Sequence, residues 1–325
     1  MNKLSKPLVF ACALLMSLAS PMSSVAQTYP SKPIRIVVPF SAGDLADVIA
    51  RVVGAKMSEQ LGQTVLVENR PGASGLVGLQ AAMQAPADGY TLVMGQMGGM
   101  AVAPNINKQP FDVRDEFVAV AGMYSNYMLL VSTNDFAPKT IPEIVAYSKA
   151  NPGKVRIGTN GEGGFPHLAI ELLKESTGLD YTHVPYKGSS QIPADVISGR
   201  IELTILGFSS LMPHVKAGKL NAVAVTGTNR PETEGSIPTF AEAVPGYQAL
   251  GWFGLFARKD TPPAVIKMLN STVNTALKMP DIVDRAHTLG LDLAAGSSED
   301  FQRMWNADHD KWGKLIRDLK LGAKN

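Results

Sequence analysis

The sequence of 325 residues contains a single cysteine, Cys12, and that residue lies in an N-terminal segment that we expect to be removed. The mature chain is therefore expected to have no disulfide, no thiolate nucleophile and no cysteine metal ligand. A lipoprotein anchored at Cys12 is the weaker alternative, because Phe10 stands where lipoproteins prefer a small residue.

Long apolar runs and net charge are also missing. No stretch after residue 26 reaches about 18 uninterrupted apolar residues, so we expect the mature chain to be soluble. Of the 30 basic residues, Lys3 and Lys6 belong to the N-terminal segment, which leaves 28 to balance the 28 acidic residues. This balance gives no indication of a nucleic-acid partner, and any preference for anions must come from local donors.

The N-terminal segment has the features of a secretory signal peptide. Lys3 and Lys6 provide a positive start, residues 7–18 form an apolar run, and residues 24–26 form a small-x-small cleavage site. We therefore expect cleavage after about Ala26 and a mature protein in the periplasm.

Residue sets typical of enzymes do not assemble. There is no G-x-S-x-G elbow, no Walker loop, no H-E-x-x-H and no kinase-like set. His167 and Glu171 lie four residues apart on a predicted helix and could share a metal, but without a third ligand a capping or packing role is favoured. His183, at a predicted strand end, is interpreted as structural rather than catalytic. The sequence predicts no enzyme, no cofactor and no metal.

Apolar runs and helical periods alternate along the chain. Residues 34–38 are almost continuously apolar, as expected of a strand buried on both faces of a parallel sheet, and a helix capped by Asp47 follows, through Leu61. The rest of this βαβαβ unit comprises predicted strands at 64–68 and 91–94 and a predicted helix at 75–85. A second unit of the same kind opens with a helix at Pro142. Its predicted strands are 155–158, 181–184, 201–206 and 222–225, and its further helices are 166–176, 190–198 and 211–217.

The two units predict an α/β protein of two lobes, each a doubly wound sheet, with a cleft between them. Extended apolar segments at 127–131 and 251–257 flank the second unit and are natural crossing points. We therefore expect lobe 1 to comprise residues 27–128 and 250–325, and lobe 2 to comprise 129–249. Two C-terminal helices, opened by Pro262–Pro263 and capped by Ser298 respectively, are expected to pack on lobe 1.

Loops rich in glycine, serine, threonine and asparagine follow the predicted strands. Such loops leave backbone N–H groups open beside helix N-termini and favour anions. The carboxyl ends of strands in open α/β sheets face the ligand, so we expect these loops to meet in the cleft. The candidate ligand-binding residues are Phe40, Ser41, Ala42, Gly43, Asp44, Asp47, Gln96, Met97, Thr159, Asn160, Gly161, Gly163, Gly164, Phe165, Tyr186, Lys187, Phe208 and Ser209.

Several segments, in order along nearly all of the mature chain, carry a family resemblance. They are Tyr29–Phe40, Val67–Ala73, Asp88–Leu92, Asn151–Val155, His183–Gly188, Ala217–Leu220 and Trp252–Ala257. Together they strongly resemble the TctC or Bug solute receptors, the periplasmic components of tripartite tricarboxylate transporters. The resemblance implies a type II, Venus-flytrap periplasmic-binding-protein fold. It also implies a carboxylic acid ligand held largely by backbone groups and waters.

Position by position, the resemblance implies that the loop Phe40–Asp47 holds one carboxylate, helped by donors near Thr159–Gly164. Asp195 matches an aspartate that we expect to fix loop or water geometry, and His167 is expected to support the site. The partners implied are inner-membrane transporter subunits, with the receptor itself a monomer.

Departures from the family pattern bear on the ligand. The first loop keeps one glycine, Gly43, where the family has proline and a second glycine, and it places Asp44 beside it. A carboxylate there would repel an anion unless it faces a cation, binds waters or points outward. Glu162 and Phe165 stand where smaller polar residues are common. We therefore expect a pocket remodelled for a larger or aromatic acid, with Phe165, Phe208 and methionines as walls.

The sequence thus predicts a receptor that captures a dicarboxylate, tricarboxylate or aromatic acid and delivers it to a tripartite tricarboxylate transporter. Two alternatives remain open. One is a sensor whose closed form binds a signalling partner, which ligand-dependent binding to a sensor ectodomain would support. The other is a secreted hydrolase using Ser41 or Ser209 with His167 or His183, which labelling by a serine-directed probe would support.

Overall fold

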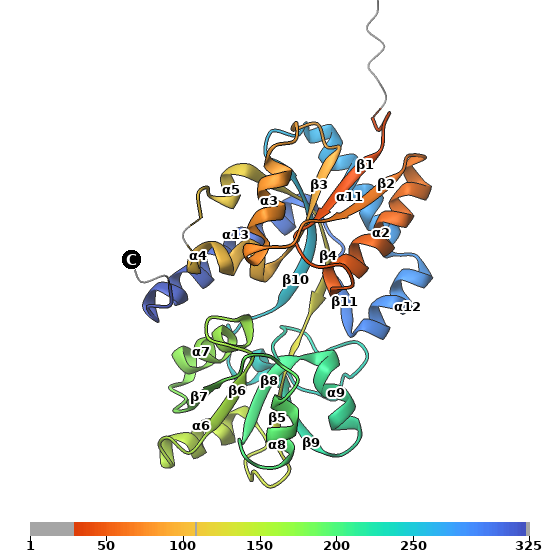
Figure 1. Cartoon of the computed structure of the whole chain (residues 1–325). Helices are drawn as coiled ribbons and strands as arrows, with labels where there is room; N and C mark the ends of the chain where they lie inside the picture. The colour runs from red at the N-terminus through yellow and green to blue at the C-terminus, as the bar shows by residue number, and fades with distance from the viewer. Residues whose placement is uncertain (1–28, 108, 323–325) are drawn as a thin grey trace, which may run out of the picture.

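The computed structural model describes residues 29–107 and 109–322, so the expected signal peptide lies outside the described residues. Figure 1 shows two lobes, each a central sheet flanked by helices, joined by extended chain. In the described part of the sequence, no helix is both long enough and apolar enough to cross a membrane.

Lobe 1 is built on a six-stranded mixed sheet with the strand order β11-β4-β10-β3-β1-β2. Its strands are β1 (Ile34–Val38), β2 (Val65–Asn69), β3 (Thr91–Gln96), β4 (Phe117–Asn126), β10 (Gly251–Arg258) and β11 (Leu291–Leu293). β1 is parallel to β2 and β3, as the buried apolar runs predict, whereas β10 is antiparallel to both β3 and β4. β4 and β11 are strands that the sequence pattern did not reveal.

The helices of lobe 1 cover both faces of this sheet (Figure 1). They are α2 (Leu45–Leu61), the 3-10 turn η1 (Ala73–Gly75), α3 (Leu76–Met83), the π-turn η2 (Gly98–Val102), α4 (Ala103–Ile106), α5 (Val113–Glu116), α11 (Pro263–Leu277), α12 (Pro280–Leu289) and α13 (Ser298–Asp318). α11 and α13 pack on β4, so the expected C-terminal packing on lobe 1 is confirmed.

Two predicted helix caps are wrong by a few residues. α2 is capped by Asp44, whose extended backbone places its carboxylate to accept from the Ala46 N–H at 3.0 Å. Asp47 lies in the first turn instead. Likewise Ser297, not Ser298, caps α13 and accepts from the Asp300 N–H. In both places two residues of the same capping type lie close together, and the backbone conformation where the chain enters the helix decides which one caps.

Lobe 2 is built on a five-stranded mixed sheet with the order β7-β6-β8-β5-β9. Its strands are β5 (Met128–Thr133), β6 (Arg156–Thr159), β7 (Thr182–Pro185), β8 (Leu203–Gly207) and β9 (Leu220–Val225). Its helices are α6 (Ile141–Ala150), α7 (Phe165–Thr177), α8 (Ile192–Ile197), α9 (Phe208–Lys216) and α10 (Phe240–Ala243). β6, β7 and β8 are parallel, and β5 runs antiparallel to both of its neighbours.

The chain crosses between the sheets twice, at adjacent places. It leaves β4 for β5 at Tyr127 and returns into β10 at Gly251, which is the register partner of Asn126. A Cβ on Gly251 would lie 2.1 Å from the Asn126 Oδ1, so a larger residue here would displace the Asn126 side chain. One buried apolar cluster also continues from lobe 1 into lobe 2 and includes Trp312 and Leu168.

Candidate ligand-binding cleft

A cavity of about 330 Å³ lies between the lobes. It is lined by Gln96, Met97, Gly98, Asn126, Met128, Asn160, Gly164, Phe165, Pro166, Ser189, Leu206, Gly207, Gly251, Trp252 and Phe253. The carboxyl ends of β3, β6 and β8 open onto it, which is where open α/β sheets bind ligands. Five of the predicted residues line it, namely Gln96, Met97, Asn160, Gly164 and Phe165.

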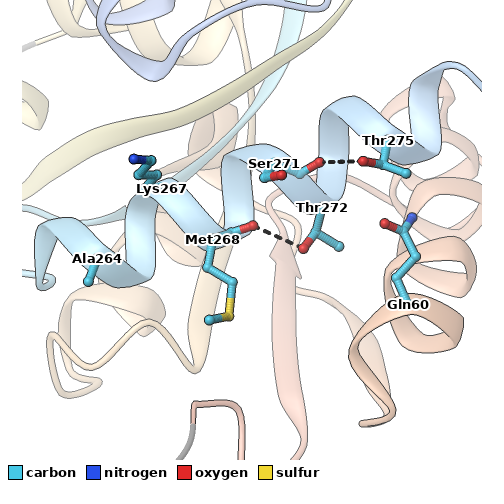
Figure 2. A pocket seen from close by; sticks show the side chains of 7 residues that line it. All are labelled: Gln60, Ala264, Lys267, Met268, Ser271, Thr272 and Thr275. Carbon is cyan, nitrogen blue, oxygen red and sulfur yellow. Dashed lines mark hydrogen bonds between the residues drawn. The ribbon is translucent and has the colours of Figure 1, made fainter.

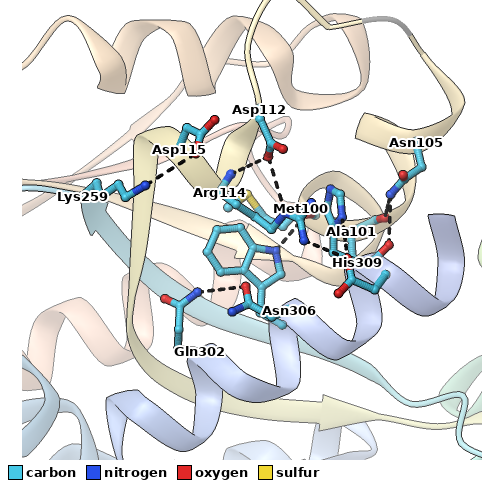
Figure 3. Close-up of polar contacts among 12 residues, drawn as sticks. Met100, Ala101, Asn105, Asp112, Arg114, Asp115, Lys259, Gln302, Asn306 and His309 are labelled. Carbon is cyan, nitrogen blue, oxygen red and sulfur yellow. Dashed lines mark hydrogen bonds and ion pairs between the residues drawn. The ribbon is translucent and has the colours of Figure 1, made fainter.

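The lobe 1 wall is formed where β3 runs directly into the π-turn η2. This unusual turn is supported from below by α13, as Figure 3 shows. The Trp305 indole N–H donates to the Met100 carbonyl at 2.9 Å, and the Asn105 amide donates to the carbonyls of Ala101 at 2.8 Å and His309 at 3.2 Å. The backbone that carries Gln96 and Met97 is therefore held by a helix distant in sequence, which suits a binding site that must keep its shape.

The loop after β1 lies beside this wall. Phe40 and Gln96 share the lining of a small hollow next to the cavity. Ser41, Ala42 and Gly43 are exposed at the loop tip. None of the loop residues 40–44 lines the 330 Å³ cavity itself within the part of the chain that the structure describes.

Asp47 organises this loop from behind. Its side chain is 3% exposed and accepts from the Gly43 N–H at 2.9 Å, the Asn69 amide at 2.9 Å and the Arg51 Nε at 3.1 Å. Burial would raise the pKa of Asp47, but the hydrogen bonds from Arg51, Gly43 and Asn69 outweigh burial and hold it below its usual value. Asp47 is therefore an ionised anchor of the loop.

The charge of Asp44 does not point into the cavity. Asp44 is exposed, and its carboxylate satisfies an N–H of its own helix instead of facing a cation across the cleft. The α2 N-terminus, which would otherwise attract an anion, is thus partly neutralised by the chain itself.

The lobe 2 wall offers freer donors. α7 begins after Gly164 and α9 after Gly207, and no side chain of the described residues caps either helix. Both glycines line the cavity. Uncapped N-terminal turns favour negative charge, so the lobe 2 side is the better place for a carboxylate. Phe165 packs edge-on against Trp312 of lobe 1, with ring centroids 5.8 Å apart.

Two histidines lie behind the lobe 2 loop instead of in the cavity. His167 is 5% exposed, accepts from the Gly163 N–H at 3.0 Å and stacks on His183 at a centroid distance of 4.0 Å. Burial and the neighbouring His167 lower the pKa of His183 to about 4. Across residues 29–107 and 109–322, no group of three or more His, Cys, Asp or Glu is placed to hold a metal.

The remaining predicted residues surround the cavity without lining it. The Tyr186 hydroxyl donates to Asp195 at 2.6 Å, and Asp195 also pairs with Arg200 at 2.5 Å. Burial and the Asp195 carboxylate raise the pKa of Tyr186 to about 12. Of the other predicted residues in these loops, Lys187 and Ser209 are exposed, whereas Phe208 and Thr159 are buried. Gly161 and Gly163 lie in the loop before α7. In two of these loops it is a neighbour, Ser189 or Gly207, that reaches the cavity.

Sequence reasoning missed the base of the cavity. Met128, Trp252 and Phe253 come from the two crossing segments, which had been interpreted only as connections, and Asn126 immediately precedes the first of them. Trp252 is fixed by its indole N–H, which donates to Asp308 at 2.8 Å. The apolar pattern of these segments carries no signal that separates a cavity wall from an ordinary buried strand.

Two larger hollows lie on the outside of lobe 1. One of about 830 Å³ lies between α11 and α13, and one of about 430 Å³ lies along α11 beside Gln60 (Figure 2). In Figure 2 the hydroxyls of Thr272 and Thr275 bond to carbonyls of their own helix. Each hollow is lined by one lobe, whereas the 330 Å³ cavity joins both lobes at the strand ends.

Comparison with known proteins agrees with this geometry. A family model described as "Tripartite tricarboxylate transporter family receptor" matches residues 49–321. The chain belongs to this family. Among curated relatives, BugT of Bordetella pertussis is 31% identical over 313 residues, covering 94% of this chain and 94% of the relative. A protein from the tcbD-tcbE intergenic region of Pseudomonas sp. strain P51 is 34% identical over 313 residues, covering 96% and 93%.

Solved structures of the receptor family share the fold. A TctC solute-binding protein from Polaromonas is 26% identical with a TM-score of 0.82, covering 90% of this chain and 100% of its own. Rpa4515 of R. palustris, solved with adipate, is 32% identical with a TM-score of 0.70, covering 89% and 97%. MatC of Rhodopseudomonas palustris, solved with malate, is 26% identical with a TM-score of 0.67, covering 89% and 100%. The predicted family and two-lobed periplasmic-binding-protein fold are confirmed.

Proposed function

We propose that this receptor captures a small carboxylic acid between its lobes in the periplasm and delivers it to inner-membrane subunits of a tripartite tricarboxylate transporter. The observation that carries the proposal is the interlobe cavity, onto which the uncapped starts of α7 and α9 open. Two family relatives were solved with adipate and malate, which are both carboxylates. We propose that the receptor acts as a monomer, which the supply of both walls of the site by one chain supports.

The lining of the cavity favours an acid with an apolar body. Among the described residues that line it, none is charged. Gln96, Asn126 and Asn160 supply amides, while Phe165 and Trp252 supply aromatic surface. A carboxylate would be held by amides and helix N-termini at one end, and an aliphatic chain or aromatic ring would contact the apolar walls.

Capture by closure of the lobes is part of the proposal. The structure is more similar to the Polaromonas protein, solved with no ligand (TM-score 0.82), than to the adipate complex (TM-score 0.70), although the latter is more identical in sequence. A rotation of two rigid lobes lowers such a score without changing either lobe. This difference supports an open arrangement here, which a ligand closes by contacting both walls.

A hydrolase gains no support. Within the described residues, neither Ser41 nor Ser209 hydrogen-bonds a histidine. A ring nitrogen of His167 instead bonds to Gly163, and a ring nitrogen of His183 bonds to Thr159. A nucleophile needs a base within hydrogen-bond reach, so we propose that the protein binds its ligand without altering it.

A thermal-shift screen of aliphatic mono- and dicarboxylates, tricarboxylates and aromatic acids tests the ligand class. We expect at least one acid to raise the unfolding temperature, because a ligand that binds only the native state stabilises it. The methyl ester of the same acid is the control and should give a much smaller shift. If no carboxylate stabilises the purified protein, the proposed ligand class is wrong. Delivery is then measured as uptake of that acid by cells with and without the receptor.

A further inference from the structure

A relay of buried polar side chains runs behind the lobe 2 loop without reaching the cavity. It begins at Glu171 on α7, which is 8% exposed and accepts from the Tyr181 hydroxyl at 2.6 Å. The Glu171 Oε1 lies 3.7 Å from the His167 Nε2, and Lys174 lies 3.7 Å from the other carboxylate oxygen. The relay ends where the His167 Nδ1 accepts from the Gly163 N–H at 3.0 Å.

These contacts fix the orientation of the His167 ring and which of its nitrogens faces Glu171. Because its Nδ1 accepts a hydrogen bond, the ring proton must sit on Nε2, where it faces the carboxylate of Glu171. Burial would raise the pKa of Glu171, but the hydrogen bond from Tyr181 and the nearby His167 and Lys174 side chains hold it below its usual value, so the carboxylate stays ionised. The ring of His167 is therefore held in one defined orientation.

A second arm reaches the same loop. The ring of His183 stacks on His167 with an angle of 6° between planes, and its Nε2 lies 2.6 Å from the Thr159 hydroxyl. That hydroxyl donates to the Gly161 carbonyl at 3.2 Å. The two histidines therefore hold both halves of the loop from behind.

We propose that His167, His183, Glu171 and Thr159 are positioning residues that preset this loop for the carboxylate of the ligand. Gly161 and Gly163 have backbone φ of +133° and +71°, a region that favours glycine. Glycine also gives an unanchored loop many other conformations. Anchoring them places Gly164 and the first turn of α7 at the cavity wall before the ligand arrives. Less ordering is then required on binding, which raises affinity. The inference rests on the proposed function, since it assumes a carboxylate at this wall.

The test compares two substitutions at one buried position. His167→Asn keeps an acceptor near the position of Nδ1, whereas His167→Leu has similar bulk and no acceptor. Calorimetry with the best acid from the screen should show affinity lowered about tenfold in His167→Leu and within about threefold of the unchanged protein in His167→Asn. Thr272→Val is the control for loss of a buried polar group elsewhere, because Thr272 is 7% exposed, lies on α11 of lobe 1 and bonds to a carbonyl of its own helix. Its affinity should stay within about twofold.

Hydrogen exchange at the Gly163 amide gives a second readout that needs no ligand. Protection should be lost in His167→Leu and retained in His167→Asn. If His167→Leu is too unstable to purify, the isosteric Thr159→Val removes the hydroxyl between His183 and Gly161 and should also weaken binding several-fold.

The outcomes separate the two claims. An unchanged protein that binds no carboxylate overturns the proposed function. An unchanged protein that binds, together with a His167→Leu variant that binds equally well, overturns this inference alone. Equal losses in His167→Asn and His167→Leu would also overturn it, because they would assign His167 a packing role.

Discussion

Asp44 and Asp47 lie one helical turn apart in the first loop and act in different ways. Asp44 is exposed and caps α2, whereas Asp47 is buried and ties the loop to Arg51 and Asn69. Aspartate favours helix N-termini, so the sequence could not show which of the two caps the helix. Substituting Asp44 therefore changes the charge at the cleft, whereas substituting Asp47 changes the stability of the loop.

Replacing Asp47 should affect stability in a pH-dependent way. Asp47→Ala is expected to lower the free energy of unfolding by about 2 kcal/mol at pH 7, because it leaves the Gly43 and Asn69 donors without their acceptor. Since the folded pKa of Asp47 lies below its unfolded value of about 3.9, its contribution is fully present above that value. It is lost as the pH falls through the folded pKa. Urea unfolding of both proteins at pH 7 and below pH 3 measures this, and a constant difference would contradict the ionised anchor.

Replacing Asp44 should affect binding and leave stability unchanged. Asp44→Asn keeps a good N-cap residue but removes a negative charge from the edge of the cleft. We expect affinity for a carboxylate to rise by roughly two- to fivefold at low salt, and the gain to shrink at high salt. Calorimetry at two ionic strengths tests this. No change at low salt would mean that the carboxylate binds far from α2.

Residue by residue, the sequence located loops better than side chains. Gln96, Asn160 and Phe165 were found because each closely follows a predicted strand, and the carboxyl ends of strands meet in space. Trp252 and Asn126 were missed because a residue that lines a cavity from within a strand looks like core. Only the folded structure, with both lobes present, shows that one side of these residues faces the cavity.

At the scale of elements, two helical glycines make a matched test of packing. A Cβ on Gly78 of α3 would lie 2.8 Å from the Pro39 Cα, whereas the nearest contact for Gly54 of α2 is a Val65 methyl at 3.4 Å. Gly78→Ala should destabilise the protein by roughly 1–3 kcal/mol and weaken ligand binding, because it displaces the loop after β1. Gly54→Ala should instead stabilise by roughly 0.5–1 kcal/mol. Chemical unfolding measures both, and equal effects would show that contact with Pro39 does not constrain α3.

The elements that could be predicted are those with a local cause. β1 is an almost continuous apolar run, and α7 and α11 have prolines in their first turns, so each was recognisable alone. β4 was not, because it depends on pairing with β10, which lies beyond all of lobe 2 in the sequence. Such long-range pairing leaves no local signature.

At the scale of the molecule, ligand binding should change the spacing between lobes. The mature chain is expected to lack cysteine, so spin labels can be attached at chosen positions. We expect the distance between labels on Gln80→Cys in α3 and Ala194→Cys in α8, both exposed positions, to change by more than about 2 Å with ligand. A pair within lobe 1, Gln80→Cys and Lys267→Cys, is the control and should stay constant. Pulsed electron resonance measures both, and an unchanged interlobe distance would contradict closure.

The two-lobed fold followed from the sequence because each lobe repeats the same alternation of buried strand and amphipathic helix. The contact between lobes did not. α13 reaches α7 through Trp312 against Phe165 and through Lys314, which pairs with Glu175 at 3.1 Å. These partners are remote in the chain, and only the assembled fold brings them together.

The two crossings also impose an order in time. β10 inserts between β3 and β4 in the lobe 1 sheet, although the whole of lobe 2 separates it from them along the chain. A chain exported from its N-terminus delivers every strand of lobe 2 before β10 emerges. Lobe 2 can thus fold before β10 joins the lobe 1 sheet, and until then the edges of β3 and β4 that pair with β10 are unpaired. We therefore expect the nascent receptor to pass through a stage in which the lobe 2 side of the cleft has folded while the unpaired edges of β3 and β4 favour aggregation.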